Sequence, residues 1–188
     1  QIKVQRCYTP EGVEIAGLRV IEPEVRRDSR GYFVETYNYR DMAAEGLDMD
    51  FVQDNQSHST KGVLRGLHYQ KEHPQGKLVR AIKGCVFDVA VDLRADSPTY
   101  GKWYGVELSE DNFRQFYVPE GFAHGYVVLS DEAVFAYKCT EFYHPGDEGG
   151  IIWNDPEIGV EWPIPEDMKL IMSDKDVKWG GLKEAFKF

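Results

Sequence analysis

The stretch VLRGLHYQ (residues 63–70) places Arg65 and His68 inside a run that is otherwise apolar and β-prone. A neutral imidazole suits the removal of a proton near neutral pH, because its reference pKa is about 6.5. In a strand, His68 would share a face with Gly66, whereas Arg65 would lie on the opposite face. A lone histidine of this kind is more often a core residue bonded to a backbone carbonyl, so other features must decide its role.

A second histidine, His124, ends the stretch PEGFAH (119–124). These two stretches resemble the paired signatures of the cupin superfamily, a group of jelly-roll proteins. Metal-binding cupins continue the first signature as His-x-His, but Gln70 occupies the second histidine's position. A metal bound by His68 and His124 would lack the third protein ligand that catalytic sites usually need. We therefore expect a site at the barrel mouth without a metal, and a metal-dependent dioxygenase is disfavoured.

The elements that must position these side chains are short strands, because apolar residues mostly recur with period two. In 86–93, Phe87, Val89, Val91 and Leu93 alternate with Asp88, Ala90 and Asp92. Further strand-like runs occupy 104–109, 115–119, 125–129, 133–143 and 150–154. Turns rich in Gly, Pro, Asp and Ser separate the runs. The best helix signal lies in the stretch 39–47, where we expect a helix that ends at Gly46. The C-terminal stretch can hold another short helix.

This pattern predicts an all-β fold, a jelly roll or double-stranded β-helix barrel with short flanking helices. The chain has 188 residues and no linker-like stretch, so we expect one domain over residues 1–188. Its net charge of −10 argues against a nucleic-acid partner, although a few cations in a cavity could still bind a small anion.

The cysteines and the hydropathy indicate the compartment. Cys7, Cys85 and Cys139 are far apart and form no CxxC motif, and we expect Cys85 and Cys139 to be buried thiols. The sequence contains no apolar stretch of about 18 residues and no signal-peptide region at its N-terminus. We therefore expect a protein of the reducing cytoplasm, with no membrane partner.

Several motifs, from about residue 17 to residue 176, closely resemble those of the dTDP-4-dehydrorhamnose 3,5-epimerase family and occur in the same order. They are FVQDNQS, KGVLRGLHYQ, QGKLVRAIKGCVFDVAVDLRADSPTYGKW, YVPEGFAHGYVVLS, EGGIIWNDPEIGVEWP and SDKD. The resemblance implies a metal-free, cupin-like homodimer that uses no cofactor. It also implies a dTDP-sugar substrate, dTDP-4-dehydro-6-deoxy-glucose, inverted at C3 and C5.

The resemblance assigns the catalytic roles. Both carbons lie next to the C4 ketone, so the reaction needs a base, stabilisation of an enolate and an acid on the opposite face. By resemblance, His68 is the base, Asp176 of SDKD orients it, and Tyr137 of FAYK is the proton donor. Lys77 and Arg65 match positions that contact the substrate, and either cation could stabilise the enolate; His124 is a further matched contact. Arg65 would reach the cavity through local twist or a bulge.

The nucleotide end is likewise assigned by resemblance. The matched binding residues are Arg30, Glu35, Gln53, Asn55, Glu148 and Lys175, with Tyr143 at the position that stacks on the thymine ring. Arg30 and Glu35 lie on an N-terminal segment that the resemblance places in the partner's cavity. Phe142 departs from the family by replacing a frequent tyrosine, and Asp174 is a variation within SDKD.

Three alternatives remain open. A related deoxysugar enzyme could invert a single carbon, or a 3,4-ketoisomerase could use the same barrel. A non-catalytic sugar-nucleotide-binding cupin is the third, but it would be expected to lose His68, Asp176 or Tyr137, and all three are present.

Overall fold

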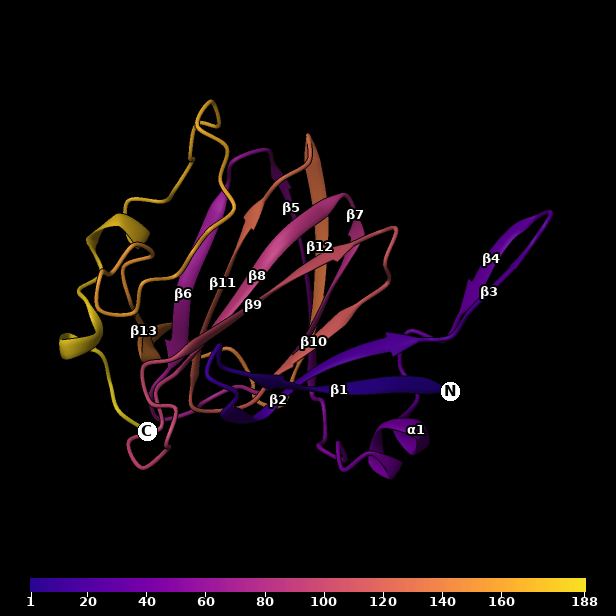
Figure 1. Cartoon of the computed structure of the whole chain (residues 1–188), viewed down its shortest axis with the longest axis horizontal. Coiled ribbons are helices and arrows are strands. Elements are labelled where there is room, and N and C mark those ends of the chain that lie inside the picture. Colours follow the sequence, from indigo (N-terminus) through magenta and orange to yellow (C-terminus); the bar gives the residue numbers. More distant parts are fainter.

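Two antiparallel sheets form the body of the protein, described for residues 1–188 by a computed structural model. The six-stranded sheet has the order β1 (Ile2–Tyr8), β2 (Glu14–Pro23), β10 (Gln115–Val118), β7 (Lys77–Lys83), β12 (Glu132–Cys139) and β5 (Gln53–Thr60). The five-stranded sheet has the order β13 (Glu148–Gly150), β6 (Leu64–Gln70), β11 (Phe122–Val128), β8 (Cys85–Asp92) and β9 (Trp103–Ser109). The architecture is the predicted jelly roll (Figure 1).

The main core lies between the two sheets. Phe116 and Phe135 enter it from the six-stranded sheet, while Val86 and Leu108 enter it from the five-stranded sheet. The Phe135 ring stacks on the Tyr126 ring with centroids 4.1 Å apart, so aromatic contact joins the sheets. Burial of these side chains holds the sheets face to face, and the functional residues attach to this rigid frame.

Smaller elements flank the sheets. Strands β3 (Val25–Asp28) and β4 (Gly31–Val34) form a hairpin that projects away from the body (Figure 1). Helix α1 (Tyr39–Ala44) begins after Asn38, whose side chain accepts a hydrogen bond from the Asp41 amide. Three short 3₁₀ helices follow later in the chain, at Pro145–Asp147 (η1), Asp176–Lys178 (η2) and Leu182–Glu184 (η3). None of these helices has the length and apolar composition that a membrane-spanning helix requires.

The C-terminal segment (residues 171–188) lies beside the edge of the five-stranded sheet, where it is drawn in yellow (Figure 1). Ile171 forms a bridge with Val63 just before β6. The Ile171 amide donates to the Gly62 carbonyl at 2.9 Å, and the Leu64 amide donates to the Ile171 carbonyl at 3.1 Å. This bridge fixes the start of the segment that carries Asp176.

The strand predictions were correct in type and less accurate at the ends. The run 150–154 is wrong as a strand, because β13 ends at Gly150. The run 133–143 is too long, since β12 ends at Cys139. The prediction that Cys85 is a buried thiol was also wrong, because Cys85 is only partly buried at the start of β8. Helix α1 and the short C-terminal 3₁₀ helices confirm the helix predictions, and the chain turns at Gly46 with a φ of 81°.

Strand β6 does not keep the regular alternation that the sequence predicts. Pairing with β11 shifts by one residue, because His68 pairs with His124 whereas Arg65 pairs with Tyr126. The extra residue is a β-bulge, which brings side chains three positions apart to the same side. Arg65 and His68 therefore both line one cavity. The simple two-face prediction was wrong here, and the expected bulge is confirmed.

Candidate active site

A cavity of about 640 Å³ opens between the two sheets. Side chains from β5, β7 and β12 line it on one side, side chains from β6 and β11 line the other, and the C-terminal segment contributes to its wall. The polar and charged side chains in its lining are Asn55, Gln56, Ser57, Arg65, His68, Lys77, His124, Tyr126, Tyr137, Ser173, Lys175 and Asp176. Three of them are lysine or arginine and one is an acid. The cavity therefore favours an anionic ligand in a chain whose net charge is −10.

His68 is held by Asp176 across a short hydrogen bond. The distance from His68 Nε2 to Asp176 Oδ1 is 2.5 Å. The imidazole side chain is 25% exposed, whereas the carboxylate side chain is 4% exposed. Because the carboxylate accepts from Nε2, the Nε2 atom carries the proton and Nδ1 is left as the basic nitrogen. The arrangement is that of a general base with an orienting acid.

The carboxylate of Asp176 accepts two more hydrogen bonds. The Gly66 amide donates to Oδ2 at 3.2 Å, and Trp179 Nε1 donates to Oδ1 at 3.0 Å. Burial alone would raise the pKa of Asp176, but the interactions with His68 and these two donors together hold that pKa below its usual value. Asp176 is therefore ionised near neutral pH and can stabilise an imidazolium.

Tyr137 faces the cavity from β12, on the sheet opposite His68. Burial raises the pKa of its phenol, with a hydrogen bond from Asn55 opposing the shift. The phenol therefore stays protonated and can donate a proton. The Lys77 ammonium lies 5.8 Å from the centre of the Tyr137 ring.

Two cations flank the same space. Lys77 on β7 has a lowered pKa, chiefly because burial disfavours its charge, while Asp88 is among the groups that oppose the shift. Arg65 on β6 is fixed by Ser59, whose hydroxyl accepts from Nε at 3.1 Å and from Nη2 at 3.0 Å. Either cation could stabilise an oxyanion that develops in this enclosed site.

His124 has a different environment from that of His68. Its Nε2 lies 2.9 Å from both carboxylate oxygens of Asp88, and both side chains are almost wholly buried. Burial lowers the pKa of His124, against the effect of Asp88. His124 therefore lines the cavity and is at the same time bonded to Asp88 on the neighbouring strand β8.

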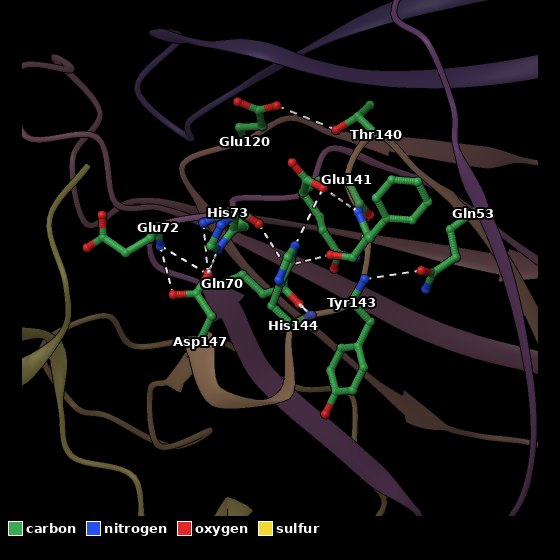
Figure 2. A network of polar contacts seen from close by, with 12 residues as sticks. Gln53, Gln70, Glu72, His73, Glu120, Thr140, Glu141, Tyr143, His144 and Asp147 are labelled. Carbon is green, nitrogen blue, oxygen red and sulfur yellow. Dashed lines mark hydrogen bonds and ion pairs between the residues drawn. The ribbon is translucent and has the colours of Figure 1, made fainter.

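The residues predicted for the nucleotide end lie along the edges of β5, β13 and the loop after β12. Gln53 Oε1 accepts from the Tyr143 amide at 3.1 Å, and Gln53 Nε2 donates to Asn55 Oδ1 at 3.0 Å. The ring of Tyr143 points away from the network around Gln53 and is exposed (Figure 2). Glu148 on β13 forms an ion pair with Lys175. Of these five side chains, Asn55 and Lys175 line the cavity that holds His68.

The loop that carries Tyr143 is held by its own polar network (Figure 2). Gln70 Oε1 accepts from the His144 amide at 2.8 Å, and the His144 ring stacks on the His73 ring with centroids 3.8 Å apart. Asp147 accepts from the His73 amide at 2.8 Å. Gln70, which replaces the second cupin histidine, therefore serves as a loop anchor.

Arg30 and Glu35 do not line this cavity. Arg30 lies in the turn between β3 and β4, where its side chain is 88% exposed and pairs with Asp28 at 2.7 Å. Glu35 follows β4 and contacts Asn38 at 3.4 Å. Within one chain the structure thus separates these two residues from the other predicted site residues.

Two residues of the site were missed by the sequence analysis. Asp88 was placed on the face opposite the apolar residues of β8, yet it is fully buried against His124. An acid inside an apolar strand is the signal that could have identified it, because a buried carboxylate needs a partner. Trp179 contacts Asp176 from an irregular segment, where no periodicity points to it.

No group of three or more His, Cys, Asp or Glu side chains is placed to hold a metal ion. The expected independence from metal stays a prediction.

Comparison with known proteins decides the family. The family model for dTDP-4-dehydrorhamnose 3,5-epimerase matches residues 12–184. The chain belongs to the dTDP-4-dehydrorhamnose 3,5-epimerase family. The epimerase of this name from Methanothermobacter thermautotrophicus is 58% identical over 168 residues, which cover 89% of this chain and 91% of the relative.

Solved structures of epimerases agree with the fold. The Legionella pneumophila 3,5-epimerase in complex with dTDP-4-keto-L-rhamnose has a TM-score of 0.89 and 47% identity, covering 97% of this chain and 94% of that chain. A 3′-monoepimerase from Streptomyces bikiniensis in complex with dTDP-quinovose has a TM-score of 0.82 and 32% identity, covering 89% and 84%. The second similarity keeps single inversion as an alternative for this epimerase family member.

Proposed function

We propose that this protein inverts C3 and C5 of dTDP-4-dehydro-6-deoxy-D-glucose to give dTDP-4-dehydro-L-rhamnose without a cofactor. The observation that carries the proposal is the placement of a base and an acid on opposite sides of one cation-lined cavity. His68 with Asp176 stands on one side, and the protonated phenol of Tyr137 stands on the other. Inversion at a carbon requires that a proton leave one face and arrive at the other.

The first step is the removal of a proton next to the C4 ketone. Nδ1 of His68 takes the proton from carbon, and the electron pair of that C–H bond forms the enolate. The His68 imidazolium that results is paired with Asp176, which is already ionised. The carboxylate thus stabilises the charge that appears on the base in this step.

The enolate places a negative charge on the C4 oxygen. Lys77 and Arg65 line the cavity where this oxygen would lie. Arg65 is fixed in advance by Ser59, and a preorganised cation stabilises developing charge without rearranging during the reaction. We assign oxyanion stabilisation to these two cations together.

The second step returns a proton to the opposite face. Tyr137 gives its phenolic proton to the carbon and is then reprotonated from solvent, while His68 releases the proton it took. The substrate is thereby inverted at that carbon, and the same pair acts again at the second carbon. His124 contacts the sugar as a neutral hydrogen-bonding partner held by Asp88.

The nucleotide is bound at the rim of the cavity. Tyr143 stacks on the thymine ring, because it is an exposed aromatic whose backbone is fixed by Gln53. Lys175 contacts the diphosphate, with Glu148 holding the ammonium in place. Asn55 and Gln53 supply amide contacts next to Tyr137 and Tyr143.

The protein acts as a homodimer in the cytoplasm. Arg30 and Glu35 are remote from the cavity of their own chain, and they lie on and just after a hairpin that projects from the body (Figure 1). A hairpin with this shape can reach a neighbouring subunit. Arg30 and Glu35 would then complete the nucleotide end of the partner's cavity.

Product stereochemistry tests this proposal and separates the alternatives. We expect the purified protein to convert dTDP-4-dehydro-6-deoxy-D-glucose into a product that NMR shows to be inverted at both C3 and C5. Inversion of one carbon would instead identify a monoepimerase, and movement of the keto group to C3 would identify a ketoisomerase. Binding without any turnover would identify a sugar-nucleotide-binding protein.

Activity should survive chelator treatment. A loss of activity that a divalent metal restores would contradict metal independence.

A further inference from the structure

Trp179 is in direct contact with the carboxylate that holds His68. It follows 3₁₀ helix η2, and its Nε1 atom donates to Oδ1 of Asp176 at 3.0 Å. The same Oδ1 atom accepts from His68 Nε2 at 2.5 Å. The Trp179 and His68 rings lie edge to face, with centroids 6.4 Å apart and planes at 72°. The indole therefore contacts both members of the pair.

The fold makes room for this indole. Gly150 on β13 pairs with His68 on β6, and a Cβ atom at Gly150 would lie only 2.5 Å from Cε2 and 2.6 Å from Nε1 of Trp179. Real Cβ atoms do not approach other atoms so closely, so a larger residue at this position would displace the ring. The indole is thus packed against the strand next to His68, with its N–H directed at Asp176.

We propose that Trp179 is a positioning residue for the base, through the carboxylate of Asp176. The proposal rests on the proposed function only in taking His68 as the base. Three donors surround the carboxylate: His68 and the Gly66 amide, both on β6, and Trp179 after η2. Gly66 holds Oδ2 and Trp179 holds Oδ1, so the carboxylate cannot rotate. It therefore accepts the hydrogen bond from His68 Nε2 in a single direction.

The indole also affects the proton affinity of the carboxylate. A hydrogen bond to an ionised carboxylate favours the ionised form, and Trp179 is among the groups that lower the pKa of Asp176. The other titratable groups near the pair are Lys175 on the same segment, which is paired with Glu148, and His124 on the neighbouring strand β11, which pairs with His68. Removal of the indole N–H should leave these groups unchanged while making Asp176 more basic.

The test removes the N–H in two ways, once with the bicyclic ring kept and once with a smaller ring. In one variant, 3-benzothienylalanine replaces Trp179, so that sulfur stands in place of the N–H group. The second variant is Trp179→Phe. The matched control is Trp162→Phe, because Trp162 Nε1 donates to the Trp153 carbonyl at 2.9 Å and does not line the cavity. We expect kcat to fall about ten-fold in both Trp179 variants, the effect of one hydrogen bond to a charged group, with KM within two-fold of the wild type. The acid limb of the pH profile should move to higher pH, and the control should match the wild type.

A second measurement does not depend on turnover. The titration of the Asp176 carboxyl carbon, followed by ¹³C NMR in the substrate-free protein, should move to higher pH in the benzothienyl variant. An unchanged titration together with an unchanged pH profile would show that Trp179 has only a packing role and does not position Asp176. If the wild type had no epimerase activity, the proposed function would fail, and the NMR titration would still decide the role of Trp179. Thermal unfolding of each variant separates these effects from loss of the fold.

Discussion

The environment of His68, more than its residue type, distinguishes it from the other histidines. His124 is also in the cavity lining, but it is buried and its Nε2 is shared between both oxygens of Asp88. His68 has its carboxylate on one ring nitrogen, and the ring is partly open to the cavity. One imidazole is thus fixed as a neutral contact, and the other is left with a free basic nitrogen.

The first prediction concerns the base itself. His68→Ala should lower kcat by at least about 100-fold, because general base catalysis commonly contributes that much. The fold should persist, since the ring lines a cavity and its loss leaves the cores between the sheets unchanged. His58→Ala is the matched control, because His58 pairs with Glu132 on the exposed side of β5. Activity and thermal unfolding of both variants check this, and unfolding of His68→Ala with normal activity in the folded fraction would contradict it.

The sequence identified individual site residues to different extents. Types and alternation alone left His68 as a core histidine, and only the motif resemblance joined it to Asp176, which is 108 positions away. The alternation of apolar and polar residues placed Asp88 on the face opposite the apolar one. This rule assumes that one face of a strand meets water. In this sandwich both faces of β8 are buried, so the rule could not find the contact with His124.

At the scale of elements, the β-bulge in β6 lets this strand contribute two functional side chains to the cavity. The bulge puts Arg65 and His68 into the same cavity. Gly66 permits it, because the residue has a φ of 120° and a Cβ atom there would lie 2.7 Å from Gly125 Cα and from the His124 carbonyl oxygen. Regular strands could be predicted from alternation, but this local shift depends on contact with β11, which no local pattern contains.

A substitution at Gly66 tests the importance of the bulge. Gly66→Ala should reduce the free energy of unfolding by about 3 kcal/mol or more, because backbone strain and a steric clash act together. Gly12→Ala is the matched control, since Gly12 also has a positive φ, 88°, but nothing lies within 4 Å of its would-be Cβ. The control should cost only about 1 kcal/mol. Urea denaturation of both variants measures this, and equal losses would show that the close approach to β11 is unimportant.

The turn after β8 is fixed by a buried acid. Asp92 is 0% exposed, and its carboxylate accepts from Arg94 Nε at 2.9 Å and from Thr99 Oγ1 at 2.7 Å. Burial would raise the pKa of Asp92, but these donors and Ser97 hold it below its usual range. The carboxylate therefore stabilises the fold above about pH 4, the unfolded value, and this contribution is lost as pH falls through the lowered folded pKa.

The prediction is a pH-dependent loss of stability. Asp92→Asn should reduce the free energy of unfolding by about 2 kcal/mol at pH 7, because hydrogen bonds to a charged group are lost. The difference between wild type and variant should shrink as pH falls below about 4, when the wild-type carboxylate becomes protonated. Urea denaturation at several pH values measures it. A difference that is constant down to pH 2 would contradict the role of ionised Asp92.

At the scale of the whole molecule, charge and architecture act together. The chain carries a net charge of −10, yet three of the four Lys, Arg, Asp and Glu side chains that line the cavity are cationic. Composition predicted the absence of a nucleic-acid partner and left room for a small anion, but only the fold shows where the cations gather. The all-β class could be predicted because it depends on a pattern repeated over the whole chain.

The quaternary prediction concerns the projecting hairpin. Light scattering should report about twice the chain mass of 21.6 kDa. If Arg30 acts in the partner's cavity, mixing the Arg30→Ala and His68→Ala proteins with subunit exchange should restore activity. The reason is that one site then combines an intact His68 with the Arg30 of the other subunit. Activity equal to the sum of the two separate variants, or a fully active monomer, would contradict this arrangement.

The central claim is that the two sheets supply opposite faces of the reaction, with His68 on β6 of one sheet and Tyr137 on β12 of the other. The most direct measurement compares proton exchange with inversion in D₂O for the wild type and Tyr137→Phe, a change that keeps the ring and deletes only the hydroxyl. The wild type should place deuterium at both C3 and C5 of the inverted product. In Tyr137→Phe, exchange next to the ketone should continue while inversion falls, because a proton returned by His68 restores the starting configuration. Inversion at the wild-type rate in Tyr137→Phe would contradict the claim.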